Sequence, residues 1–219
     1  MNIAETSAVR IRDRSNKLYS RVAAIYAAWV RLGSLGAFPN LYREGATALA
    51  LSPGQTVLDM CCGTGELLPF LQKAVGPGGR IVGCDLSPVM LAQAQARATS
   101  AGWGNVDLVC ADALTFQPDR PIDAAIFSIC LSAIPWRVEV LDHVIGLLPS
   151  GGRVVIIDSL TIPGRGLANL YNRAKGRIIG ADPDCGLRNA AADRLSDLRE
   201  RHAAGGVYSL IEGRTFQRV

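Results

Sequence analysis

The sequence is poor in the residues on which metal and nucleic-acid sites are usually built. It has only two histidines among 219 residues, and its six cysteines include no Cys-x-x-Cys pair, so we expect no metal site. The net charge of +4 is small, and the basic residues are spread along the chain. This charge distribution argues against a nucleic-acid partner.

Long apolar runs are also missing. The chain has no stretch of about 18 apolar residues, so we expect no transmembrane helix. Its first residues lack the basic and then apolar pattern of a signal peptide. We therefore expect a cytoplasmic protein whose cysteines stay reduced and serve as small apolar side chains. With 49% hydrophobic and 19% charged residues, the chain is expected to form a globular core.

Two glycines stand in a short segment between two apolar runs. Residues 57–68 read Val-Leu-Asp-Met-Cys-Cys-Gly-Thr-Gly-Glu-Leu-Leu, which predicts a strand, a tight turn and the start of a helix over 66–75. Gly63 and Gly65 allow the backbone to turn sharply and a ligand to come close. Because open α/β sheets bind ligands at the carboxyl ends of their strands, we expect the site at this turn.

The type of ligand follows from the residues around the turn. A dinucleotide site would need a third glycine at the position of Leu68, and Glu66 in the first helical turn would repel a pyrophosphate. About 20 residues further on, the next apolar strand ends at Asp85, which is placed to accept hydrogen bonds from ribose hydroxyls. The two motifs together predict a nucleoside ligand without a diphosphate.

The remaining pattern predicts an α/β fold. Near-continuous apolar strands alternate with helical stretches, which is typical of a doubly wound, mostly parallel sheet with helices on both faces. We expect strands at 56–61, 80–85, 106–110, 124–129 and 152–158, and helices at 88–100 and 136–148. Helical spacing over 8–33 and 41–51 predicts an N-terminal helical lid over residues 1–51, followed by a ligand-binding domain over 52–219.

The C-terminal part contains one clear strand, at 205–213, and only a short apolar run at 215–219. We therefore expect either an abbreviated hairpin or a sheet edge that a second copy completes, as in a homodimer. His202 is interpreted as the cap of a late helix.

Residues 58–67, Leu-Asp-Met-Cys-Cys-Gly-Thr-Gly-Glu-Leu, resemble the first motif of class I S-adenosylmethionine-dependent methyltransferases. The double cysteine before Gly-Thr-Gly is similar to the ubiquinone/menaquinone C-methyltransferase branch, although many members of the wider family have glycine in place of Cys61. The resemblance implies a Rossmann-like domain and S-adenosylmethionine, a nucleoside without phosphate, as the cofactor. The implied cofactor-binding residues are Asp59, Cys61, Gly63, Gly65, Asp85, Leu86, Met90, Asp112, Ala113 and Ser128.

Several of these assignments have alternatives. Asp112 either accepts a hydrogen bond from the adenine amine, as the resemblance implies, or closes a turn with nearby backbone. Leu86 and Met90 either pack on the adenine ring or belong to the core. Ser128 either orients the acceptor or the cofactor's carboxylate, or faces solvent.

The acceptor is expected to be a small molecule. Residues 128–136 lack both the Asn/Asp-Pro-Pro-Tyr/Phe and the Pro-Cys motifs of enzymes that methylate nucleic acids. The quinone branch carries Tyr-Asp-x-x-Ala-x-x-Tyr-Asp in its lid, and here both tyrosines match while both aspartates are replaced. The candidate acceptor-binding residues are Tyr19, Tyr26, Trp29, Ser132, Trp136 and Tyr171. Tyr19, Tyr26 and Trp29 could equally pack on the core.

A helix expected near 167–179 places three basic residues, Arg173, Lys175 and Arg177, on its polar side. A solvated face is the ordinary interpretation, and an anionic acceptor or a membrane surface is the alternative. No residue is assigned as a catalytic base. Three other functions stay open: methylation of a phospholipid headgroup with peripheral membrane contact, transfer of the aminocarboxypropyl group of the same cofactor, and cofactor binding without turnover.

Overall fold

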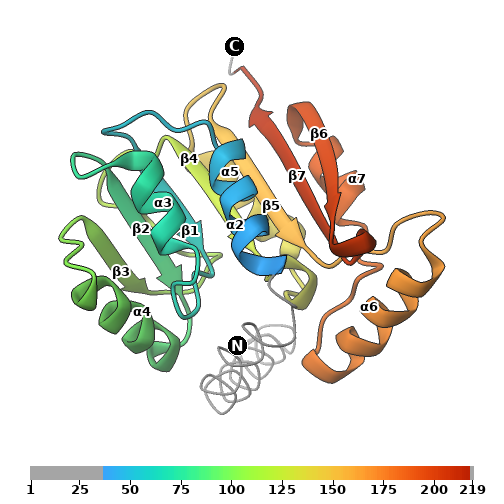
Figure 1. The fold of residues 1–219 in the computed structure, drawn as a ribbon. Helices are drawn as coiled ribbons and strands as arrows, with labels where there is room; N and C mark the ends of the chain where they lie inside the picture. The colour runs from blue at the N-terminus through green and yellow to red at the C-terminus, as the bar shows by residue number, and fades with distance from the viewer. Residues whose placement is uncertain (1–36, 218–219) are drawn as a thin grey trace, which may run out of the picture.

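The computed structural model describes residues 37–217, which form one seven-stranded sheet with helices on both faces (Figure 1). The strand order is β3-β2-β1-β4-β5-β7-β6. Neighbouring strands from β3 to β5 are parallel, and β7 is antiparallel to both β5 and β6. The strands are β1 Thr56–Met60, β2 Arg80–Asp85, β3 Val106–Cys110, β4 Ala124–Ser128, β5 Arg153–Asp158, β6 Leu195–Ala203 and β7 Tyr208–Thr215.

Burial of the strands follows their place in the sheet. The central strands β1, β4 and β5 are almost entirely buried because helices cover both of their faces. The edge strand β3 is partly exposed along its length. The predicted parallel α/β sheet is therefore confirmed, with strand ends within one residue of the expected positions.

Six α-helices flank the sheet in residues 37–217: α2 Ala37–Ala48, α3 Leu68–Val75, α4 Pro88–Ser100, α5 Arg137–Leu147, α6 Gly166–Ile179 and α7 Leu187–Ala192. Apolar side chains of α2, α3 and α4 share one core cluster, and those of α5 and α7 share the cluster on the other face. Figure 1 shows α2 lying across the middle of the sheet, in front of β4 and β5. None of the described helices is long and apolar enough to cross a membrane.

The helix predicted at 66–75 begins at Leu68, so Glu66 lies before its first turn. The helix expected at 41–51 is α2, which begins at Ala37 and packs against β5 and β7. Residues 1–36, which include Tyr19, Tyr26 and Trp29, lie outside the described residues. The division into a lid over 1–51 and a domain over 52–219 therefore stays a prediction.

The C-terminal hairpin is complete, so the expectation of a missing strand was wrong. Strands β6 and β7 pair in antiparallel register, with a bulge between Ser196 and Arg199, and His202 lies in β6 instead of ending a helix. Strand β6 reads Leu-Ser-Asp-Leu-Arg-Glu-Arg-His-Ala. An edge strand exposed on its outer side can carry this many charges, and its pattern therefore does not resemble a buried strand. The homodimer was expected because the sequence pattern showed no clear second strand at this edge. That argument no longer applies, and the homodimer stays a prediction.

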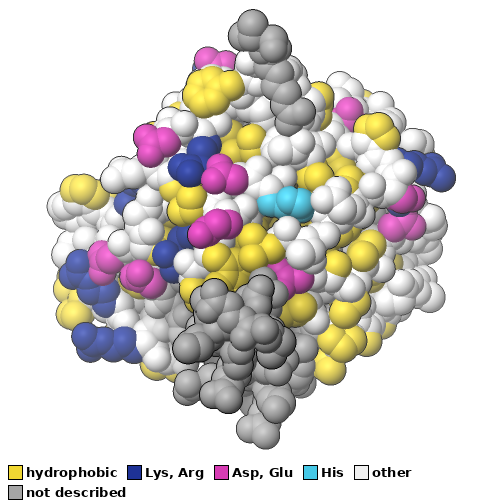
Figure 2. Space-filling view, turned by 180° about the vertical axis from the view of Figure 1, so that it is seen from behind, with side chains coloured by type: hydrophobic (Ala, Val, Ile, Leu, Met, Phe, Trp, Pro, Cys, Tyr) yellow, Lys and Arg dark blue, Asp and Glu magenta, His cyan; other side chains and the backbone are white. Residues whose placement is uncertain are grey.

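Charged side chains of both signs are interleaved on the rear face of the molecule, as Figure 2 shows. Three ion pairs of the described residues combine such charges: Arg80 binds Asp107 and Asp119, and Arg194 binds Asp142. Figure 2 shows no broad basic surface on the rear face of residues 37–217.

Candidate functional site

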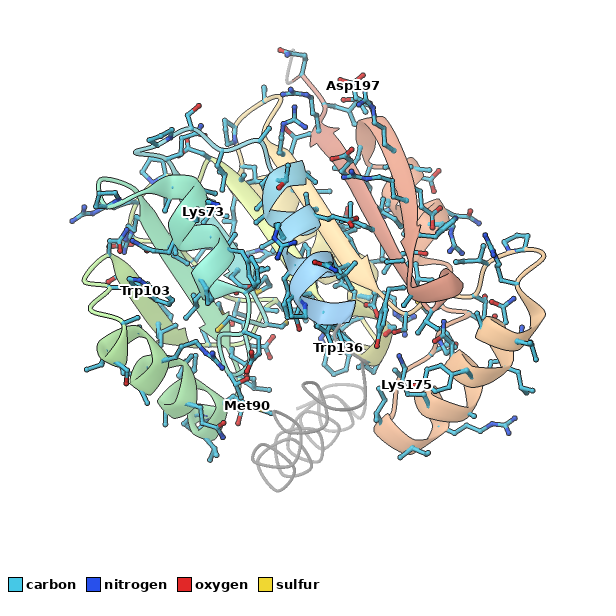
Figure 3. All side chains as sticks on the ribbon, in the orientation of Figure 1. Lys73, Met90, Trp103, Trp136, Lys175 and Asp197 are labelled. Atoms are coloured by element: carbon cyan, nitrogen blue, oxygen red, sulfur yellow. The ribbon has the colours of Figure 1, made fainter. Side chains whose placement is uncertain are left out.

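The parallel strands end at one edge of the sheet, and the chemically distinctive residues gather there. Figure 3 places Met90, Trp136 and Lys175 along this edge, although they come from three different helices or helix ends. The glycine turn follows β1 at the same edge. The structure thus brings together the ends of β1, β2, β4 and β5, as the sequence predicts.

The two glycines of the turn have different roles. Gly63 has a φ of +54°, and a Cβ there would meet no atom within 4 Å. Gly65 has a φ of +73°, and a Cβ there would lie 2.6 Å from Leu68 Cδ1 and 3.0 Å from Ala94 Cβ. Gly65 therefore allows the turn to pack closely against Leu68 of α3 and Ala94 of α4, while Gly63 leaves open space beside the backbone for a ligand.

Asp85 connects the end of β2 to this turn. Its Oδ2 accepts a hydrogen bond from Gly63 N–H at 2.9 Å, and its Oδ1 accepts one from Ser87 N–H at 2.8 Å. Burial raises the pKa of Asp85, and these backbone hydrogen bonds oppose the rise. The carboxylate is held rigidly beside the open space at Gly63.

Asp59, in β1, is completely buried, and neither of its carboxyl oxygens has a hydrogen-bond partner among residues 37–217. Burial raises its pKa to about 8, and the charge of Asp85 adds to the rise. The hydroxyl of Thr64 in the turn is also buried without a partner within that part of the chain. Unsatisfied polar groups of this kind are costly, which is why they often mark a place where a ligand binds.

Cys61 has a left-handed backbone, with a φ of +61°. This conformation explains why glycine is common at the same position in the family that the motif resembles. The Cys61 and Cys130 thiols lie close enough to interact, and Cys130 Sγ donates to Met60 O at 3.8 Å. The thiols join the ends of β1 and β4, and all six cysteines of the chain are free.

Glu66 is neutralised by an arginine. Arg97 of α4 binds the Glu66 carboxylate and also donates from Nε to Thr64 O at 3.2 Å. The negative charge near the turn is thus paired, and its effect on a ligand is smaller than the sequence suggests.

The candidate adenine-side residues lie at the neighbouring ends of β2 and β3. Asp85 is in register with Cys110, two residues before Asp112. Asp112 is half-buried, and its Oδ1 accepts from Leu114 N–H at 2.9 Å, as a turn aspartate does. Leu86 is exposed, whereas Met90 is buried but belongs to neither core cluster. Ala113 is half-buried beside Asp112.

The candidate acceptor-side residues lie at the end of β4, in the segment between β4 and α5, and on α6. Ser128 is half-buried near Tyr42 of α2, and its hydroxyl is buried without a hydrogen-bond partner among residues 37–217. Ser132 is buried, and both its N–H and its hydroxyl donate to Asp158. Trp136 is half-buried against the core, and Tyr171 is exposed on α6. Ser132 thus organises a carboxylate within the protein.

Sequence reasoning missed three residues of this edge, Tyr42, Thr64 and Asp158, and it named Lys175 only as one of three basic residues on α6, with an anionic acceptor as the alternative interpretation. Lys175 was expected on a solvated face with Arg173 and Arg177, which are indeed exposed, but Lys175 is buried. The sequence did contain one signal, Gly176, because a glycine inside a helix often has a packing reason. In the structure, a Cβ at this position would lie 2.4 Å from Ala181 O. This close approach identifies the side of α6 that packs inward, and Lys175 lies on it.

Comparisons with known proteins agree with this geometry. Residues 57–152 match a family model described as "Methyltransferase domain". The chain is 27% identical to a demethylmenaquinone methyltransferase from Listeria monocytogenes over 172 residues, which cover 77% of this chain and 73% of the relative. It is 34% identical to a 2-phytyl-1,4-naphtoquinone methyltransferase from Synechococcus elongatus over 148 residues, which cover 67% of this chain and 64% of that protein.

The chain belongs to the class I S-adenosylmethionine-dependent methyltransferases. The fold of the methyltransferase is also found in geranyl diphosphate C-methyltransferase from Streptomyces coelicolor, with a TM-score of 0.70 and 15% identity over 81% of this chain and 76% of that one. The resemblance inferred from residues 58–67 is therefore confirmed, and so is S-adenosylmethionine as the cofactor.

Proposed function

We propose that the methyltransferase binds S-adenosylmethionine at the glycine turn and methylates a small aromatic acceptor of the quinol type. The observation that carries the proposal is Asp59, whose buried carboxyl has no hydrogen-bond partner among residues 37–217 and interacts electrostatically with Asp85, the residue that binds Gly63 N–H. A ligand with a cationic group and no phosphate suits these residues. The quinol class is supported by the two curated relatives, whose names refer to menaquinone and naphthoquinone methylation.

The cofactor residues would share the work as follows. Asp59 would accept hydrogen bonds from the cationic part of the cofactor, and Asp85 from the ribose hydroxyls. Gly63 and Cys61 shape the turn, while Gly65 lets the turn pack against Leu68 of α3 and Ala94 of α4. The remaining contacts are assigned to Leu86, Met90, Asp112, Ala113 and Ser128.

When bound, S-adenosylmethionine supplies a methyl group on a positively charged sulfur. The protein then has to hold the acceptor in line with that methyl group and keep water away, which can provide a large part of the catalysis. Ser132, Trp136 and Tyr171 are the candidates for this task among residues 37–217, together with Tyr19, Tyr26 and Trp29 outside them.

The direct test incubates the purified full chain with S-adenosylmethionine and 1,4-naphthohydroquinone kept reduced by dithionite. We expect a product heavier by one methyl group, and S-adenosylhomocysteine in equal amount, by mass spectrometry. Methylthioadenosine in its place would indicate aminocarboxypropyl transfer. Cofactor binding without consumption, with this and other ring acceptors, would favour a non-catalytic protein.

A second proposal concerns peripheral membrane contact through α6. Leu167, Leu170 and Ile178 are 87%, 67% and 81% exposed along one side of this helix, with Arg165 and Arg177 exposed nearby. Apolar side chains flanked by cations are typical of helices that lie on anionic membranes. We expect sedimentation with phosphatidylglycerol vesicles, weakened by Leu167→Ser together with Ile178→Ser. Methyl transfer to phosphatidylethanolamine in such vesicles would instead support headgroup methylation.

A cytoplasmic location remains part of the proposal. It is supported by the six free thiols, because a reducing compartment keeps cysteines unpaired. Fractionation of cells that express the chain would test it.

A further inference from the structure

Lys175 is a buried cation at the acceptor end of the sheet. It belongs to α6 and lies near the end of β5 and the start of β7 (Figure 3), and only 6% of the residue is exposed. Its ammonium donates one hydrogen bond, to Ser159 Oγ at 2.5 Å. The Nζ also lies 4.9 Å from the ring centroid of Tyr208 and 5.6 Å from that of Tyr171.

The nearest carboxylate does not form an ion pair with Lys175. Asp158 is held by Ser132 N–H at 2.8 Å, by the Ser132 hydroxyl at 2.6 Å and by Ser159 N–H at 2.7 Å. Within residues 37–217, no carboxylate forms a salt bridge with Lys175. Burial lowers the pKa of Lys175 to about 8, and the negative charge of Asp158 opposes this shift without contacting the ammonium.

This arrangement is unfavourable for stability alone. A buried ammonium with a single hydrogen bond is poorly compensated, and an apolar side chain of similar length is often better tolerated at such a site. The lysine stands beside Ser159, directly after β5, and Ser159 adjoins the carboxylate that holds the loop after β4. Two of the three ammonium protons have no hydrogen-bond acceptor within the described part of the chain, so they are available to an anionic ligand.

We propose that Lys175 binds the ionised hydroxyl of the acceptor, so that the acceptor is held as an oxyanion. The inference rests on the proposed function and narrows its acceptors to rings with an acidic phenol or enol. The hydroxyl proton leaves to solvent when the acceptor binds. The resulting negative charge increases the electron density on the ring and on its oxygen, both of which are possible sites of methylation. A cationic amine acceptor would be repelled by the same ammonium.

The test compares two rings that differ in one hydroxyl group: 4-nitro-1-naphthol, whose visible spectrum reports its ionisation, and 1-nitronaphthalene, which has no hydroxyl. Both are titrated into the full chain saturated with S-adenosylhomocysteine, so that no methyl transfer occurs. At a pH below the solution pKa of the naphthol, we expect wild-type protein to shift the bound spectrum to that of the anion. Lys175→Met should abolish the shift and weaken naphthol binding at least about ten-fold, while 1-nitronaphthalene binds equally to both.

Lys73→Met is the matched control, since Lys73 is an exposed lysine on α3, away from the site (Figure 3), and it should behave as wild type. Unchanged S-adenosylhomocysteine affinity and an equal or higher melting temperature would show that Lys175→Met is folded. If Lys175→Met keeps the anion spectrum and the affinity, the role of Lys175 is wrong while the proposed function stands. If neither ring binds wild-type protein that still binds S-adenosylhomocysteine, the aromatic acceptor and the role of Lys175 both fail.

Discussion

Two buried aspartates at the same edge of the sheet differ in how the protein treats them. Asp59 in β1 is 0% exposed and has no hydrogen-bond partner in residues 37–217. Asp158 at the end of β5 is 1% exposed and accepts three hydrogen bonds from Ser132 and Ser159. Burial raises the pKa of both carboxyls, but only Asp158 is compensated by hydrogen bonds from the chain itself.

The two aspartates thus distinguish the two halves of the site. At the end of β1 the buried polar groups need a ligand as hydrogen-bond partner, whereas at the end of β5 the chain itself supplies the partners. The β1 end leaves both Asp59 and Thr64 unsatisfied, so we expect its energetics to change on cofactor binding. The β5 end is internally bonded around Asp158, and there the cation Lys175 makes a single hydrogen bond, to Ser159 Oγ. The acidic half suits a cationic cofactor, and the basic half suits an anionic acceptor.

The largest expected effect is on the pH dependence of stability in the absence of ligand. Burial raises the pKa of Asp59 from 3.8 to about 8. The protonated carboxyl therefore contributes fully to the free energy of unfolding below about pH 4. This contribution is lost as the pH rises to about 8, at up to about 1.4 kcal/mol per pH unit. Asp59→Asn should flatten this decline in urea unfolding measured from pH 5 to pH 8. Asp119→Asn, an exposed control, should keep the wild-type slope. Equal slopes for wild type and Asp59→Asn would remove the contrast between the two aspartates.

Next in size is the loss of cofactor affinity in Asp85→Ala. Gly63 N–H and Ser87 N–H lose their acceptor, which loosens the glycine turn. The proposed hydrogen bonds from the ribose hydroxyls to the Asp85 carboxylate are also lost, at about 1.5–3 kcal/mol each, so we expect S-adenosylhomocysteine to bind about 100-fold more weakly. Isothermal titration calorimetry measures this, with Asp107→Ala as the control. Unchanged affinity would remove Asp85 from the cofactor site.

The two glycines should separate stability from binding. Gly65→Ala places a Cβ 2.6 Å from Leu68 Cδ1, and overpacking with left-handed strain is expected to cost about 2–3 kcal/mol of unfolding free energy. Gly63→Ala meets no atom within 4 Å, so it should cost only about 1 kcal/mol while weakening cofactor binding. Urea unfolding and calorimetry on both variants test this, and similar losses of stability would contradict it.

The smallest effect concerns Cys61. Cys61→Gly removes left-handed strain at a φ of +61°, and we expect a gain of about 0.5–1 kcal/mol, measured as a higher urea midpoint. The lost thiol contact with Cys130 opposes the gain, so Cys130→Ala serves as the companion variant. A clearly destabilised Cys61→Gly would show that the thiol pair matters more than the strain.

Much of the cofactor half could be predicted from the sequence because its signals are local. Apolar runs gave β1 and β2, and the glycine spacing gave the turn to which Asp85 is bonded. The acceptor half depends on tertiary contacts. Tyr42 reaches Ser128 from a helix 86 positions earlier in the chain. Lys175 was placed on a polar face because helical periodicity alone does not distinguish a lysine that is covered by β7 from one in solvent.

The same local rules failed for β6. Its charges resemble those of a polar helix or loop, and only pairing with β7 defines it as a strand. Edge strands whose charged side chains prevent aggregation are therefore the elements that a prediction from hydrophobic pattern is most prone to miss.

The raised pKa of Asp59 has a consequence for how the empty protein takes up its ligand. At neutral pH the Asp59 carboxyl is protonated, and it must release this proton when a positively charged ligand binds to its oxygens. Ligand binding is therefore coupled to proton release, so the binding heat measured by calorimetry will depend on the ionisation enthalpy of the buffer. Affinity should also increase toward alkaline conditions and level off near pH 8.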